Sequence, residues 1–274
     1  SGETLSGVTL KAPAGSSVVT PATTILEAQP DIEPAQLAVA LGIPTTAADG
    51  TAIDLTSFNP YAEDADPAVA LAAEKAAQQV MVTIKAVSAA AEGAGMDSSD
   101  AFENAMASVA EVVSEVAEKI DVSSEEAIQA AEEAVASGEV KKMDFADSEV
   151  LNDISSTVQE KVTEAAALDE EIIIDENAFS SVLETAITAV ENVNAQIDLV
   201  EDLSSEESMG VFATVTDMAS EVKAAAESEV LDPGSGLELV TFVDAARVEQ
   251  AAADAALLVQ DKLAEAAEKF EEIY

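Results

Sequence analysis

The chain has 274 residues, of which 49% are hydrophobic, and its 55 acidic against 11 basic residues give a formal net charge of −44 at pH 7. This apolar content is too high for a disordered polyanion, and the acidity argues against nucleic acid or an anionic membrane surface as a partner. Cys and His are absent, which excludes disulfides, zinc–thiolate sites and Ser-His-Asp catalysis. No run of about 18 apolar residues occurs, so we expect no membrane insertion.

The first 20 residues differ in composition from the rest of the chain. Two short β-like runs flank Pro13 and Gly15 within residues 4–19. They predict a β-like junction or tether over residues 1–20, comparable to the last strand of an upstream β-module.

The next segment carries helix-start signals. Thr20 followed by Pro21 is typical of an N-cap and a first helical turn. We expect one short helix over residues 21–29 and another over 34–41, the second ended by Gly42.

From residue 67 onward, apolar residues recur at steps of three and four, with acidic and hydroxyl side chains between them. Five such stripes occur: Val69, Ala73, Ala76, Val80, Ile84, Val87 and Ala91; Phe102, Met106, Val109, Val113, Val116 and Ile120; Leu151, Ile154, Val158 and Val162; Phe179, Leu183, Ile187, Val190, Val193 and Ile197; Ala252, Ala256, Val259, Leu263, Ala266, Phe270 and Ile273. Capping-box patterns at Ser123–Glu126 and Ser204–Glu207 predict helix starts, and Gly138 and residues 232–236 predict stops.

These patterns predict an all-α fold: a multi-helix bundle or a helical-hairpin repeat with a short β-like N-terminal lead-in. We divide the chain into the lead-in at 1–20, short helices with an acidic loop at 21–66, and a long-helix bundle at 67–274.

A weak internal repeat lies within the long helices. Residues 100–121 resemble residues 177–198, and an SSEE segment follows in both cases. This favours a duplicated helix pair at about 98–137 and 175–228. The alternative is that helices rich in Ala, Val and Glu resemble one another by composition alone.

Two separate stretches carry a resemblance to a known class of protein. The first is LKAPAGSSVVTPATT, with Leu10, Lys11, Ala12, Pro13, Gly15, Val18, Val19, Thr20, Pro21, Thr23 and Thr24 at the matching positions. The second is DLTSFNPY, with Asp54, Leu55, Ser57, Phe58, Pro60 and Tyr61. Together they resemble a segment of very large secreted surface proteins of aquatic bacteria, over about residues 4–90.

In those proteins the segment commonly follows cadherin-like or bacterial immunoglobulin-like β-sandwich modules and leads into Ala-rich helices. The resemblance implies an extracellular or cell-surface location, an adhesin-like or matrix-like context and calcium-binding neighbours. It does not imply an enzyme.

The acidic loop is the candidate metal site. Calcium prefers several oxygen ligands, and closely spaced acidic and amide side chains in a loop provide them. The candidate ligands are Asp49, Asp54, Asn59, Asp64 and Asp66. The spacing does not match an EF-hand, and the alternative is that these residues serve as helix N-caps and turn formers.

We therefore expect a non-catalytic extracellular structural or interaction module of a bacterial surface, adhesin or matrix protein, stabilised by calcium. Its expected partners are divalent cations and other protein modules of the same or neighbouring chains. The alternative is a helical binding module with an apolar inter-helix pocket for a small ligand, lined by Gly210 and the helix expected at 210–218.

Overall fold

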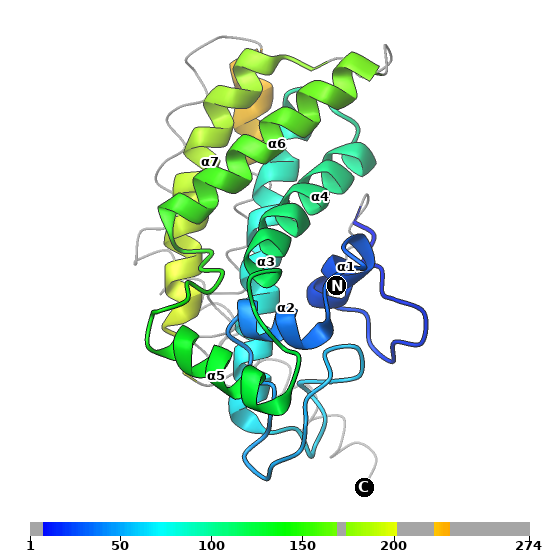
Figure 1. Ribbon diagram of the computed structural model, residues 1–274. Coiled ribbons are helices and arrows are strands. Elements are labelled where there is room, and N and C mark those ends of the chain that lie inside the picture. Colours follow the sequence, from blue (N-terminus) through cyan, green and yellow to red (C-terminus); the bar gives the residue numbers. More distant parts are fainter. Residues whose placement is uncertain (1–7, 169–173, 202–221, 231–274) are drawn as a thin grey trace, which may run out of the picture.

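The computed structural model describes residues 8–168, 174–201 and 222–230 (Figure 1). Within these residues the chain forms helices, turns and one isolated bridge between Thr46 and Ala52. The predicted all-α class is therefore confirmed. None of the described helices is long and apolar enough to cross a membrane.

Seven helices have described boundaries, and residues 222–230 form a further helical segment. The seven are α1 (Pro21–Ala28), α2 (Pro34–Ala40), α3 (Pro67–Gly93), α4 (Ser98–Ala117), α5 (Glu125–Ala136), α6 (Ser148–Leu168) and α7 (Glu176–Asp198). The two short helices predicted at 21–29 and 34–41 are confirmed as α1 and α2.

The four long helices form a bundle-like group. Helices α4 and α7 each contact both α3 and α6, and α3 and α6 also contact each other less extensively. In Figure 1 the four run side by side, with α1 and α2 against one flank and α5 near one end. Helices α4 and α7 thus hold equivalent places between α3 and α6.

Apolar stripes supply the core, as the periodicity predicts. Helix α6 buries four residues, and they are the four of its predicted stripe: Leu151, Ile154, Val158 and Val162. All six stripe residues of α7 are buried as well. Burial of such faces is the main driving force for packing helices together.

A set of polar side chains crosses the interface between α3 and α7. Asn194 is fully buried, and its Nδ2 donates to the Phe145 carbonyl at 2.8 Å and to Thr83 Oγ1 at 3.4 Å. Gln79 Nε2 donates to the Asn194 carbonyl at 3.2 Å and to Asp198 Oδ1 at 3.0 Å. Asn194 Oδ1 is buried and finds no partner among the described residues, so only the donor half of this amide is satisfied. The bonds that Asn194 Nδ2 and Gln79 Nε2 make across the interface favour one alignment of α3 and α7 along their length.

The strand-like lead-in is not confirmed, because residues 8–20 contain no strand. One backbone bond, from Ser17 N to Thr56 O at 2.8 Å, joins this segment to the loop before α3. Val8 and Leu10 pack against the helical core instead. The division of the chain into three regions stays a prediction.

One helix start is shifted by a residue from its predicted position. The N-cap of α5 is Ser124, whose Oγ accepts from Ala127 N at 3.1 Å, rather than Ser123. The predicted stop at Gly138 is confirmed by its positive φ of 77° directly after the C-cap. The signals at 204–207 and 232–236, and the last apolar stripe, lie outside the described residues.

Candidate functional site

The two stretches that carry the resemblance lie together in space. The Lys11 amide donates to Thr24 Oγ1 at 3.0 Å, which ties the lead-in to α1. Thr20 caps α1 by accepting from the Thr23 amide, while the Thr23 hydroxyl accepts from the Thr20 amide. The Ser17–Thr56 bond then joins the first stretch to the second, so both belong to one local structure.

An apolar groove of about 520 Å³ lies where these two stretches meet α3. Its apolar lining comes from the lead-in, the start of α1, the loop after α2, the DLTSFNPY turn and one face of α3. The apolar lining residues are Val8, Leu10, Val18, Val19, Pro21, Ala22, Ile43, Leu55, Phe58, Pro60, Tyr61, Ala73, Ala77 and Met81. Val19 and Tyr61 remain largely exposed to solvent, so this groove is an open apolar feature of the surface.

One carboxylate, Glu74, lines this groove and is only 7% exposed. Its Oε1 accepts from Gln78 Nε2, one turn further along α3, at 2.7 Å. The neighbouring Lys75 directs its ammonium elsewhere, to the Asp198 carbonyl at 2.8 Å. The four ion pairs found among the described residues do not include Glu74.

Tyr61 lies beside this carboxylate. Partial burial, together with a hydrogen bond to Glu74 and its negative charge, raises the pKa of Tyr61 to about 12. The phenol therefore stays protonated and uncharged at neutral pH. Tyr61 as a whole is 70% exposed and lies at the rim of the groove.

The acidic loop forms a second hollow, of about 650 Å³, next to the start of α3. All five predicted metal ligands line it: Asp49, Asp54, Asn59, Asp64 and Asp66. Among the described residues, however, no three acidic side chains are placed to hold a metal ion together. A calcium site therefore stays a prediction.

Four of these five side chains have local structural roles. Asp66 caps α3, with Oδ1 accepting from the Ala68 and Val69 amides and Oδ2 from the Ala48 amide. The other three close turns by accepting the amide two residues further on: Asp49 from Thr51, Asp54 from Thr56 and Asn59 from Tyr61. The alternative interpretation as N-caps and turn formers describes these four residues.

The turn bonds also set the protonation of two of these groups. Hydrogen bonds from Thr51 lower the pKa of Asp49, and the Ala48 and Val69 amides lower the pKa of Asp66. Both carboxylates are therefore held in the charged form at neutral pH.

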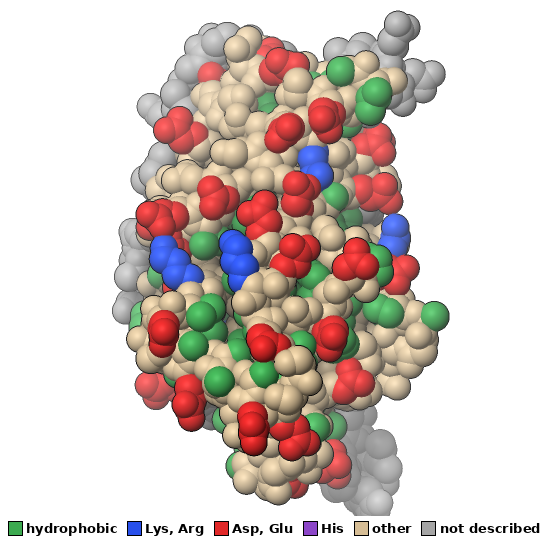
Figure 2. Space-filling view, in the orientation of Figure 1, with side chains coloured by type: hydrophobic (Ala, Val, Ile, Leu, Met, Phe, Trp, Pro, Cys, Tyr) green, Lys and Arg blue, Asp and Glu red, His purple; other side chains and the backbone are tan. Residues whose placement is uncertain are grey.

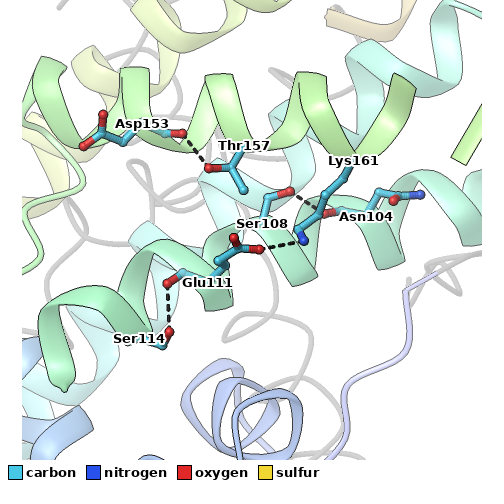
Figure 3. A network of polar contacts seen from close by, with 7 residues as sticks. All are labelled: Asn104, Ser108, Glu111, Ser114, Asp153, Thr157 and Lys161. Carbon is cyan, nitrogen blue, oxygen red and sulfur yellow. Dashed lines mark hydrogen bonds and ion pairs between the residues drawn. The ribbon is translucent and has the colours of Figure 1, made fainter. Parts of the chain in front are cut away.

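A network of polar side chains lies along α4 and α6, and its bonds hold the helices and their backbones in place (Figure 3). Lys161 Nζ lies 2.6 Å from Glu111 Oε2 and links the two helices. The hydroxyls beside it bond to backbone carbonyls of their own helices: Ser108 to Asn104, Ser114 to Glu111 and Thr157 to Asp153. Such hydroxyls are engaged with the helix backbone and not with a general base.

Among the charged side chains on the visible face, acidic ones are far more numerous than Lys and Arg, which are few and scattered (Figure 2). On this face the acidic side chains are spread over the described surface and are not gathered in one place. This distribution fits general attraction of cations better than one concentrated acidic site.

Comparisons with protein-family models, with curated proteins and with solved structures found no match for this chain.

Sequence reasoning missed the groove and its carboxylate. One signal was present: Glu74 occupies the same row of α3 as Ala70, Ala77 and Met81, at helical spacings of three and four. An acidic residue that interrupts an apolar row indicates a buried charge. The residues expected to line a pocket at 210–218 lie outside the described part of the chain.

Proposed function

We propose that the chain is a non-catalytic structural and interaction module of an extracellular bacterial surface, adhesin or matrix protein. The observation that carries this proposal is the union of the two resembling stretches. They are far apart in sequence, yet they contact each other through Ser17 and Thr56 and pack on the same face of α3. Two resembling stretches that pack together support a common structural module better than two stretches that lie apart in the structure.

Charge and composition support the same function. A strongly acidic helical protein is suited to salty surroundings outside the cell. Dissolved ions there shorten the distance over which its carboxylates repel one another. The partners in this proposal are neighbouring protein modules and divalent cations. Calcium in the acidic hollow belongs to the proposal, because all five candidate ligands line this one hollow and oxygen is the ligand atom that calcium prefers.

A duplicated helix pair is the finer architectural part of this proposal. The equivalent places of α4 and α7 between α3 and α6 support it. The helix predicted after α7 lies partly outside the described residues.

The proposed function is tested by whether the protein lies on the outside of the cell. Antibodies raised against the chain should label intact cells of the organism that encodes it, and external protease should remove the label. Labelling that requires cell lysis would contradict an extracellular module. A cytoplasmic marker protein, probed in the same cells, controls for leakage.

A further inference from the structure

Glu74 is a buried carboxylate for which the described residues provide only neutral partners. Gln78 donates to it at 2.7 Å, and the Tyr61 phenol is its other polar neighbour. Burying a charge is costly unless an opposite charge or a full set of hydrogen bonds accompanies it. A cation bound next to the Glu74 carboxylate would therefore offset the cost of burying its negative charge.

The side chains around Glu74 indicate what the uncharged part of a ligand would be. Phe58, Met81 and Leu10 give the groove apolar walls, and the exposed ring of Tyr61 lies at its edge. Ligand pockets typically have volumes of about 300–1,000 Å³, apolar walls and a few polar groups that orient the ligand. At about 520 Å³ this groove has the size for a small organic molecule.

A bare metal ion does not fit the same groove. Calcium and magnesium need several oxygen ligands, whereas Glu74 is the one carboxylate that lines the groove. The Thr20 hydroxyl and the Asn59 side-chain oxygen, which also line it, are engaged in the α1 cap and in a turn. An aromatic ring next to a carboxylate suits an organic ammonium group instead, because both attract a cation with apolar substituents.

We propose that the groove binds a small organic amine, with its protonated nitrogen at the Glu74 carboxylate and its apolar part against Phe58 and Met81. This goes beyond the proposed function and does not depend on it. It gives the alternative of a small-ligand binding module a location formed by the lead-in, the DLTSFNPY turn and α3.

Three probes separate the two halves of the ligand: hexylamine, which carries both charge and chain, ethylamine, which carries the charge, and hexanol, which carries the chain. Tyr61 can report binding, because the sequence has two tyrosines and no tryptophan. In a Tyr274→Phe variant, a change in tyrosine emission comes from Tyr61 alone. Hexylamine should saturate one site and bind more tightly than either other probe.

The Glu74→Gln substitution should weaken hexylamine binding by about tenfold or more, because it removes a charge-assisted contact. Glu126→Gln is the matched control: it removes one charge from the exposed face of α5, outside the groove. Calorimetry gives the affinities, and circular dichroism checks that both variants remain folded.

Equal weakening by the two substitutions would overturn the proposal, because it would mean general attraction to an acidic surface. Equal affinities for hexylamine and ethylamine would overturn it as well. If a Lys-containing peptide bound in a Glu74-dependent manner while hexylamine did not, the groove would belong to a protein partner and not to a small amine.

Discussion

Gly93 of α3 lies directly against Ala226 of the helical segment 222–230. A Cβ on Gly93 would sit 2.4 Å from the Ala226 Cβ and 2.3 Å from the Lys223 carbonyl oxygen. Beside this contact, Lys223 Nζ pairs with Glu92 Oε2 at 2.8 Å, and the ion pair with Glu92 raises the pKa of Lys223. The absence of a side chain at Gly93 lets the segment approach α3 this closely.

Gly93→Ala should destabilise the protein by about 1–3 kcal/mol, because the added methyl group overpacks a tight contact. Helix propensity acts in the opposite direction, since Ala is favoured over Gly in a helix by about 0.5–1 kcal/mol. The sign of the change in urea denaturation therefore distinguishes the two effects. A stabilised variant would contradict close packing at this position.

Asn194→Ala should destabilise the protein by about 2–4 kcal/mol. The substitution leaves the buried Phe145 carbonyl without its donor and opens a small cavity between α3 and α7. Asn192→Ala is the matched control, two residues away on the exposed face of α7, where its side chain bonds only to the Thr188 carbonyl. Chemical denaturation of both variants measures the difference, and equal effects would contradict a role for the buried network.

Asp66→Asn should reveal how protonation of the α3 cap affects stability. Hydrogen bonds lower the folded-state pKa of Asp66 below 3.8, so its ionised form stabilises the fold above that pH. This contribution is lost as pH falls through the lowered folded-state value. Asn remains a good N-cap but does not titrate.

The wild type should therefore exceed Asp66→Asn in stability at pH 7, and the gap should narrow well below pH 3.8. Comparing the two proteins at each pH cancels the relief of general acid repulsion, which both share. Urea denaturation at constant salt measures the gap. A gap that is the same at both pH values would contradict the contribution of the ionised cap.

Calcium should raise the melting temperature more than sodium does at equal ionic strength. The reason is that a divalent cation bridges or pairs with carboxylates, whereas sodium mainly screens them. Replacing Asp49 and Asp64 together by Asn should reduce the excess effect if the cation resides in the acidic hollow. Equal shifts of the melting temperature with the two salts would contradict calcium binding, because they would mean that both cations only screen the charges.

Much of the helical architecture could be predicted from local sequence. The periodicity predicts the buried stripe of α6 correctly because one face of a helix repeats every 3.6 residues. The Thr20 cap is also predictable, because it depends on hydrogen bonds between residues close in sequence. The start of α5 was missed by one residue because Ser123 and Ser124 are adjacent and both can cap a helix.

The conformation of the lead-in and the presence of the groove depend on contacts between segments distant in sequence. Local sequence patterns do not predict such contacts. Val18 and Val19 favour extended backbone, but strand formation depends on a pairing partner, and one bond to Thr56 does not make a ladder. Glu74 likewise lies where the lead-in and the DLTSFNPY turn meet α3, and this meeting is not visible in the local sequence of α3. Both features come from packing between distant segments.

The central claim is that the lead-in and the DLTSFNPY turn form one folded unit with the helices. Residue-resolved hydrogen exchange at the amides of Lys11 and Ser17 tests it most directly, since their acceptors lie in α1 and in the turn. We expect both amides to be protected nearly as strongly as amides within α1. Exchange at the rate of an unfolded chain at both amides would mean a free tether, and would contradict it.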